Sequence, residues 1–335
     1  MSRPIELRPG LPAKERMRLW LAGAVLILAV FLAYQPAWHA GFIWDDDDYV
    51  THNPLLAAPD GLWRIWFSGD SLSQYFPLTY TVFRLEYQMW GLNQTGYHLF
   101  NIFLHAVNAL LVWRLLCRLR LPGAWLAAAI FALHPVQVES VAWVSELKNV
   151  LMGFFFLSSL LCWVEFIRTD AGQGRQCYFL SLIFFALALF SKTTACTLPF
   201  VLLLILWWGN EPINKMRLRQ IAPFLMLSVG MGLLTMLWER NHIGTRGDLF
   251  SLGFPERILI ASHAIWFYLG KLLMPLNLSF SYPKWEVSSG KLLACGWLAA
   301  LGGLGVIVLW SRRFLGRGLE TAILFYVITL GPLLG

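Results

Sequence analysis

The stretch LWLAGAVLILAVFLAYQPA, Leu19 to Ala37, decides the fold class of this chain. It contains no charged residue and approaches the ~20 residues that an α-helix needs to cross the ~30 Å hydrocarbon core of a bilayer. Similar stretches recur along the 335 residues, which are 58% hydrophobic and 13% charged, with a mean hydropathy of +0.59. The sequence therefore predicts an all-α polytopic membrane protein. The first stretch is too long and too late for a cleaved signal peptide, so it is a retained span.

Lysines and arginines set the predicted topology. With residues 1–18 as a cytoplasmic N-terminal segment, the short inside loops are almost purely basic and most acids fall outside, as the positive-inside rule requires. The apolar segment Arg257–Leu273 then cannot cross, because its flanks Arg240–Arg246 and Asn277–Lys284 must share the outer side. The predicted spans lie near Leu19–Ala37, Tyr97–Leu116, Pro122–His134, Val150–Ile167, Cys177–Phe190, Thr197–Trp208, Ile221–Trp238, Leu292–Trp310 and from Leu319 onward.

Four consecutive aspartates, Asp45 to Asp48, follow the first span directly. Charge packed this densely repels itself and is costly to bring close to lipid. One interpretation is a solvated acidic turn. The other is a site for acid–base chemistry or for a divalent cation, whose ligands would be Asp45 and Asp46.

The rest of the first outside loop predicts two amphipathic helices, Gly61–Phe67 and Leu78–Trp90, which can lie in the membrane interface or merely cover a surface. The next span carries polar residues at spacings of three and four, which places them on one helical face. Lipid cannot satisfy such side chains, so they either bond neighbouring helices or line a cavity. They are Gln94, His98, Asn101, His105 and Asn108.

Two further segments hold candidate charges. HPVQVESVAWVSELKN, His134 to Asn149, forms a predicted outside loop, where Glu139 can face the aspartates or simply be solvated. Lys192, at the outer end of a short span, can bind a phosphate or extend to the lipid head groups. The chain lacks the sequence signatures of P-loop nucleotide hydrolysis, zincins and serine hydrolases, and it shows no basic-aromatic nucleic-acid motif.

These segments together resemble the transmembrane and tetratricopeptide-repeat (TPR) O-mannosyltransferase family, within the wider C-type glycosyltransferase (GT-C) superfamily. The resemblance covers roughly Phe42 to Gly335. Its blocks are FIWDDDDYVTHNPLL, SQYFPLTYTVFRLEYQMWGLNQTGYHLFNIFLHAVNALL, FALHPVQVESVAWVSELKNVL, LFSKTTACTLPFVLLL and ILIASHAIWFYLGKLLMPLNLSFSYPKW. It implies a GT-C-like transmembrane catalytic domain over residues 19–335, with the repeat domain expected beyond residue 335.

The resemblance also implies roles for residues. Asp45 and Asp46 match the family's acidic pair, one of which deprotonates the acceptor hydroxyl, and Glu139 matches a second acid. Lys148 and Lys192 match positions suited to the donor phosphate. Asp47 and Asp48 exceed the usual pair, so the sequence does not say which aspartate is the base. The predicted cavity-lining residues are Tyr75, His98, Asn101 and His105.

The expected activity is transfer of a sugar, mannose by resemblance, from a polyprenyl-phosphate donor to a hydroxyl of a protein or glycan on the outer or lumenal face. No cofactor is implied apart from the optional divalent cation, and no nucleic acid is involved. The expected location is the bacterial inner membrane, or the ER membrane in a eukaryote. Two alternatives remain open: a transporter or flippase of lipid-linked sugars, and a non-catalytic membrane scaffold for the repeats.

Overall fold

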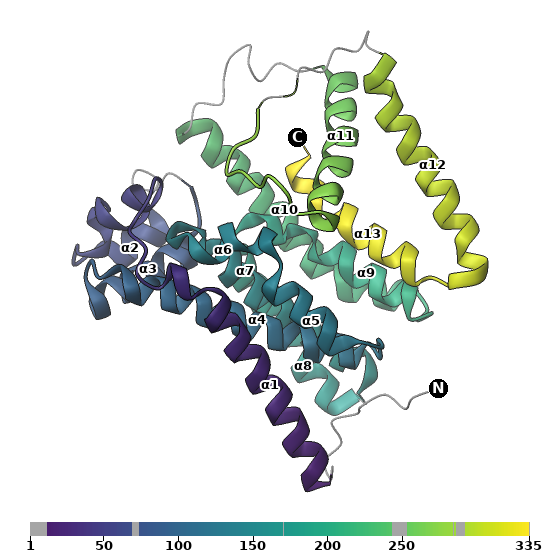
Figure 1. The fold of residues 1–335 in the computed structure, drawn as a ribbon, viewed down its shortest axis with the longest axis horizontal. Coiled ribbons are helices and arrows are strands. Elements are labelled where there is room, and N and C mark those ends of the chain that lie inside the picture. The colour runs from purple at the N-terminus through teal and green to yellow at the C-terminus, as the bar shows by residue number, and fades with distance from the viewer. Residues whose placement is uncertain are drawn as a thin grey trace. The chain divides into compact units, whose positions relative to one another are not determined.

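The computed structural model describes residues 12–68, 74–169, 171–242, 253–283, 285 and 292–334. Within these ranges the regular structure is all helical, and the chain forms two compact units, Met1–Ala195 and Cys196–Gly335 (Figure 1). Among the described residues, six helices are long and apolar enough to cross a membrane, and a bent helix pair would be a seventh. The predicted all-α polytopic class is therefore confirmed. Residues 1–11 of the predicted N-terminal segment, and the flanking Arg246 and Lys284, lie outside the described residues.

Helices α4 (Gln94–Arg118) and α7 (Leu147–Arg168) form the centre of the first unit. They pack against each other, and α7 also packs along α8 (Ala171–Ser191) (Figure 1). On its other sides α4 contacts α1 (Ala13–Ala33) and α5 (Ala124–Leu133). This bundle buries a continuous apolar core, which fixes the helix ends that carry the candidate site.

The first unit has a basic end and an acidic end. Arg118, in the last turn of α4, pairs with Glu165 near the end of α7 at 2.7 Å, so these two helices run parallel. Helix α1 runs the opposite way along α4, because Tyr34 at its C-terminal end stacks edge-on against His105 in the first half of α4. The acidic turn after α1 therefore lies near the N-terminal ends of α4 and α7.

The segment between α1 and α4 contains both amphipathic helices that the sequence predicts. Helix α2 spans Gly61–Phe67, and α3 spans Pro77–Trp90, with Pro77 at its first position. Both helices expose large apolar side chains, such as Phe67 and Met89, while their other faces are buried. Shorter turns precede them: η1 (Gln35–Ala37), η2 (Asp47–Thr51) and η3 (Pro54–Leu56).

Gly61 allows α2 to approach the η3 turn closely. A Cβ atom at this position would lie 2.0 Å from the carbonyl oxygen of Leu55, which also accepts a 2.6 Å hydrogen bond from Arg84. Gly61→Ala must therefore displace backbone, and we expect a loss of about 1–3 kcal/mol in the free energy of unfolding. Thermal unfolding in nanodiscs measures this loss. Gly41→Ala is the matched control, since a Cβ at Gly41 meets nothing within 4 Å; equal midpoints for the two variants would contradict the prediction.

The structure defines the extent of two predicted segments. The short span predicted over Cys177–Phe190 extends into the neighbouring loop, because α8 begins at Ala171. The predicted outside loop from His134 to Asn149 is helical, because α5 bends by 50° into the helical segment Pro135–Ala142. This segment comprises η4 (Pro135–Gln137) and α6 (Val138–Ala142), and η5 (Val144–Glu146) follows it.

The helices of the second unit are α9 (Leu198–Trp208), α10 (Lys215–His242), α11 (Phe254–Leu273), α12 (Leu292–Leu315) and α13 (Gly318–Leu330), followed by η8 (Gly331–Leu333). This unit has a basic end of its own. Arg317 donates to the carbonyl oxygen of Trp207 at 2.7 Å and to Asn210 Oδ1 at 2.6 Å, which joins the end of α9 to the turn before α13. Helix α10 starts near this end, and α12 ends there with Arg312 and Arg313 in its last turn.

This arrangement bears on the predicted course of Arg257–Leu273, which is most of α11. If α10 and α12 each cross the membrane, the end of α10 and the start of α12 lie on the same side. Helix α11 between them then makes no net crossing, and it is not among the six candidate spans. The absence of a crossing remains a prediction.

Candidate active site

The four aspartates form a tight turn that leads into the single π-helical turn η2. The turn begins with Trp44 at φ +50°, and the backbone N–H of Asp46 bonds to the carbonyl oxygen of Ile43 at 3.0 Å. A tryptophan with positive φ is strained, and such strain is found where surrounding structure imposes it, often at functional sites. Ile43 and Trp44 expose their side chains. Exposed apolar and aromatic groups of this kind suit a membrane interface.

Asp46 is fully buried and holds the turn in place. One carboxylate oxygen accepts from the N–H of Ile43 at 2.9 Å, and the other accepts from the N–H of Ser145 at 2.7 Å. Burial raises the pKa of Asp46, while the two backbone N–H groups and the charge of His98 act in the opposite direction. Asp46 therefore links the acidic turn to η5, and both of its oxygens already have partners.

The other three aspartates differ in their surroundings. Asp47 accepts a 2.6 Å hydrogen bond from the hydroxyl of Thr51, and Asp48 is exposed. Asp45 is half-buried, and within the described ranges no donor binds its carboxylate. Asp45 thus combines partial desolvation with free acceptor oxygens, as a general base requires.

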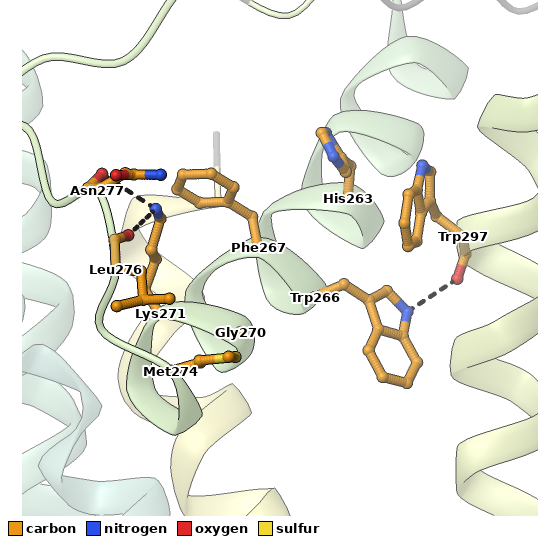
Figure 2. Close-up of a pocket in the computed structure, with 9 residues that line it drawn as sticks. All are labelled: His263, Trp266, Phe267, Gly270, Lys271, Met274, Leu276, Asn277 and Trp297. Carbon is orange, nitrogen blue, oxygen red and sulfur yellow. Dashed lines mark hydrogen bonds between the residues drawn. The ribbon is translucent and has the colours of Figure 1, made fainter.

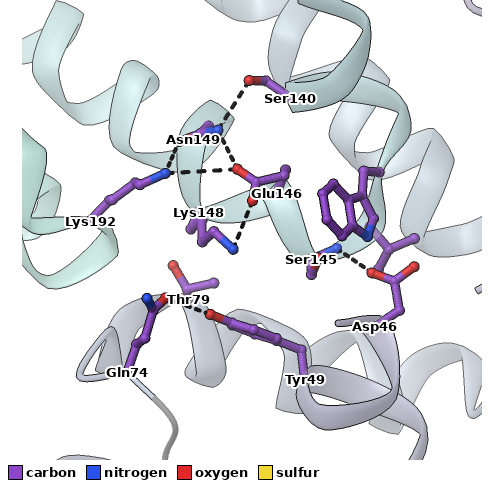
Figure 3. Close-up of polar contacts among 12 residues, drawn as sticks. Asp46, Tyr49, Gln74, Thr79, Ser140, Ser145, Glu146, Lys148, Asn149 and Lys192 are labelled. Atoms are coloured by element: carbon purple, nitrogen blue, oxygen red, sulfur yellow. Dashed lines mark hydrogen bonds and ion pairs between the residues drawn. The ribbon is translucent and has the colours of Figure 1, made fainter. Parts of the chain in front are cut away.

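A cluster of charges lies directly after Ser145 in the chain (Figure 3). Glu146 is buried and pairs with Lys148 Nζ at 2.8 Å and with Lys192 Nζ at 3.8 Å. Lys192 also donates to Asn149 Oδ1 at 2.6 Å, and the Asn149 amide in turn donates to Glu146 and to Ser140 Oγ. Two lysines thus share a single buried glutamate, and the local charge of these three groups is positive.

Of the two lysines, Lys192 has the longer contact with Glu146. Burial lowers the pKa of its ammonium group, Glu146 and Glu139 oppose this shift, and Lys148 adds to it. Its contact with Glu146 is long, so the positive charge is only partly compensated. Lys148 is instead enclosed, with its Nζ atom 4.8 Å from the centre of the Tyr49 ring. The Tyr49 ring is itself held in place, because it stacks on Tyr80 and its hydroxyl donates to Gln74. Lys148 is therefore bounded by a fixed ring on the side of the acidic turn.

Glu139, the predicted second acid, lies at the edge of this cluster. It is exposed on α6, and its charge interacts with Glu146, Lys148 and Lys192. Ser145 contacts the acidic turn directly, through its N–H to Asp46, and Trp143 does so through its indole N–H to the carbonyl oxygen of Ile43 at 3.3 Å. Glu139 is therefore placed to contact a molecule that enters the cluster from outside.

The polar seam of α4 bonds neighbouring elements, which is one of the two interpretations that the sequence left open. Each of its buried side chains donates to a backbone carbonyl of another element at 2.8 to 3.1 Å. The pairs are His98 with Ala40, Asn101 with Trp143, His105 with Ala132, and Asn108 with Val150. These bonds hold the loops around the site, while His98 Nδ1 and Asn108 Oδ1 are buried without a hydrogen-bond partner among the described residues. The cavity-lining role of the seam therefore remains a prediction. Tyr75, the remaining predicted lining residue, is half-buried before α3 and donates to the carbonyl oxygen of Trp66 at 3.2 Å.

The candidate site includes four residues that sequence reasoning did not assign: Tyr49, Ser145, Glu146 and Asn149. Glu146 falls in the predicted outside loop His134–Asn149, and the structure buries it between two lysines. Its signal in the sequence is the spacing of Glu146, Lys148 and Asn149, which brings a carboxylate, an ammonium and an amide to one helix start. Among the described residues, no group of three or more His, Cys, Asp and Glu side chains is arranged to hold a metal ion.

Comparisons with known proteins identify relatives of one kind. A protein O-mannosyl-transferase of Caenorhabditis elegans is 27% identical over 288 residues, covering 79% of this chain and 39% of the relative. Mouse TMTC2 is 34% identical over a region that covers 46% of this chain and 20% of TMTC2. Human TMTC4 is 30% identical over a region that covers 50% of this chain and 26% of TMTC4. Both are protein O-mannosyl-transferases by name.

The chain spans less than half the length of these relatives. No family model matches the chain. No solved structure matches it either. By sequence, the chain is a homologue of the TMTC protein O-mannosyl-transferases.

Proposed function

We propose that this chain carries the catalytic membrane region of a glycosyltransferase. The enzyme moves mannose from a polyprenyl-phosphate donor to a serine or threonine hydroxyl of a protein, on the outer or lumenal face of the membrane. The relatives support the transferase and its protein acceptor. The donor class rests on the resemblance and on the charged cluster beside the acidic turn.

One observation carries the proposal: a single dipeptide joins the acidic and basic halves of the site. The N–H of Ser145 binds Asp46 of the acidic turn, and the next residue, Glu146, holds both lysines. Adjacent Cα atoms are only about 3.8 Å apart. A carboxylate and a pair of cations are therefore held within side-chain reach of each other. Transfer from a phosphate donor to a hydroxyl needs this combination.

The proposed reaction uses Asp45 as the base. The acceptor hydroxyl gives its proton to the Asp45 carboxylate while its oxygen forms a bond to the anomeric carbon of the sugar. The bond from that carbon to the phosphate oxygen breaks, and the electron pair leaves with the polyprenyl phosphate. Asp46 acts as a positioning residue, because its two backbone hydrogen bonds fix the turn on which Asp45 stands.

The lysines stabilise the leaving phosphate. Lys192 is only weakly paired with Glu146, so its charge remains available as negative charge grows on the departing oxygen. Lys148 is more tightly paired with Glu146, so we assign it the weaker interaction with the leaving phosphate. Glu139 at the edge is placed to accept a hydrogen bond from a sugar or acceptor hydroxyl.

The proposed topology puts the acidic turn outside and the loop between α7 and α8 inside. In a background without cysteines, Asp60→Cys and Gln173→Cys test it, because both positions are exposed and lie on opposite predicted sides. An impermeant maleimide applied to intact cells should label the cysteine at 60 and leave the one at 173 unlabelled until the cells are opened. Equal labelling of both positions in intact cells would contradict the topology.

The donor class is tested with two labelled substrates. Membranes containing the full-length protein should transfer label to a protein acceptor from polyprenyl-phosphate-mannose but not from a nucleotide-linked mannose. A lipid-phosphate leaving group suits the two lysines that Glu146 holds beside the acidic turn. Transfer from the nucleotide sugar alone would overturn the proposed donor.

A further inference from the structure

The second unit contains a pocket of about 480 Å³ that the proposed reaction does not use. Figure 2 shows it between α11, the segment that follows α11, and the first part of α12. All of its lining residues belong to this unit: His263, Trp266, Phe267, Gly270, Lys271, Met274, Leu276, Asn277 and Trp297.

Aromatic side chains form the walls of the pocket. The indole N–H of Trp266 donates to the carbonyl oxygen of Trp297 at 3.2 Å, which ties α11 to α12. The ring of His263 lies 5.1 Å from that of Trp297 and 4.3 Å from that of Trp285. These contacts fix the positions of the large side chains, so the walls are rigid and mostly apolar.

Lys271 supplies the positive charge of the pocket. Its Nζ donates to the carbonyl oxygens of Leu276 at 2.7 Å and Asn277 at 3.1 Å, and lies 5.4 Å from the ring centres of Phe267 and Tyr282. Within the part of the chain that the structure describes, no Asp or Glu pairs with it. An ammonium group has three N–H donors. One donor and an uncompensated charge therefore remain for a ligand.

The surface next to the pocket is apolar. Leu273 is 78% exposed, Met274 66% and Leu276 59%, and Leu278 and Phe280 continue this exposed run. In a chain with several candidate spans, such a surface is suited to lipid tails. A fixed cation beside a run of exposed apolar side chains matches a molecule with an anionic head and a hydrocarbon tail.

We propose that this pocket binds a membrane lipid with a phosphate head group. The phosphate accepts the free N–H of Lys271, the polar part next to the phosphate packs on Trp266 and Trp297, and the tail lies along Leu273 and Met274. None of the residues that line the pocket belongs to the candidate active site. A negative result here leaves the assays of glycosyl transfer untouched.

Two variants test the pocket in different ways. Lys271→Met removes the charge and keeps the apolar stem. Gly270→Leu fills the pocket without touching the lysine: a Cβ there meets nothing within 4 Å, and leucine favours a helix over glycine. The matched controls are Arg257→Met, about 21 Å away along the same helix, and Gly302→Leu, an equally open glycine of α12 that does not line the pocket.

Binding is measured by native mass spectrometry on the full-length chain, with dioctanoyl phosphatidylglycerol, farnesyl phosphate and inorganic phosphate as probes. We expect at least one lipid probe to bind, with affinity reduced about 10- to 100-fold by Lys271→Met and by Gly270→Leu. The controls should retain wild-type affinity. The lipid probe that responds identifies the source of the head group, a glycerophospholipid or a polyprenyl phosphate.

Two results would contradict a lipid site in this pocket. If neither lipid loses affinity in Gly270→Leu, the pocket is not the binding site, whatever Lys271→Met does to folding. If inorganic phosphate binds as tightly as the lipids, the tail contributes nothing and the site is not a lipid site.

Discussion

Asp45→Asn is expected to lower the rate of sugar transfer by about 10²–10⁴, the contribution of a positioned general base. Asparagine is nearly isosteric with aspartate but cannot take the proton of the acceptor hydroxyl. Asp45 is half-buried and its carboxylate accepts no hydrogen bond within the described ranges, so the substitution leaves the backbone contacts of the turn in place. Turnover with labelled donor measures the effect, while donor affinity and thermal stability should stay near wild type.

The neighbouring aspartates provide controls on the same turn. Asp48→Asn changes an exposed carboxylate and should keep most of the activity. Asp46→Asn removes the acceptor for one of two backbone N–H groups, so it should lower thermal stability as well as turnover. If Asp45→Asn keeps the wild-type rate while Asp46→Asn or Asp48→Asn loses it, the base is assigned to the wrong residue. Wild-type rates in all three variants would remove these three aspartates from the chemistry.

Lys192→Met is expected to lower turnover by about 10²–10³ and to weaken donor affinity as well. The methionine keeps the apolar stem and removes the charge that faces the leaving phosphate, together with the contacts of Lys192 to Asn149 and Glu146. Lys148→Met should have a smaller effect on turnover, because Lys148 is more tightly paired with Glu146. Lys215→Met removes an exposed charge at the start of α10 and serves as the control. Unchanged turnover and donor affinity in Lys192→Met would show that this lysine only extends to the head groups.

The pH profile gives a second readout for Lys192. Its burial lowers the pKa of the ammonium group, so its charge is present at low pH and is lost at a lower pH than for an exposed lysine. If protonated Lys192 stabilises the leaving phosphate, turnover should fall on the alkaline side, below the usual lysine range. Lys192→Arg keeps a charge up to higher pH, and the fall should shift upward or disappear in that variant. An identical alkaline limb in both proteins would assign it to another group.

The fold class could be predicted from the sequence because a membrane leaves few options. Uncharged stretches such as Leu19–Ala37 have to be helices when lipid offers no hydrogen bonds. The spacing of polar residues along α4 likewise predicted a shared face, and those side chains do bond neighbouring elements from one helix. Local sequence patterns therefore sufficed to predict the helical spans and the polar face of α4, because each depends on residues close together in the chain.

The site was only partly predictable, because it depends on contacts between segments far apart in the chain. Nothing in the run of four aspartates shows that Asp46 is buried against Ser145, 99 residues further along. Glu146 resembles a solvated loop glutamate until α7 and α8 pack and bring Lys192 beside it. The choice of Asp45 as the base therefore comes from which carboxylates already have partners, and that depends on tertiary structure.

Transfer of the sugar from lipid to protein can be followed directly with a labelled donor. Purified full-length protein in nanodiscs is given polyprenyl-phosphate-[³H]mannose and a protein acceptor, and the acceptor is then treated with alkali to release O-linked sugar. We predict labelled mannose from the wild type and at most about a hundredth of it from Asp45→Asn at equal donor binding. No transfer by the wild type despite bound donor, or movement of the intact lipid-linked sugar across the bilayer, would contradict a glycosyltransferase and favour a scaffold or a flippase.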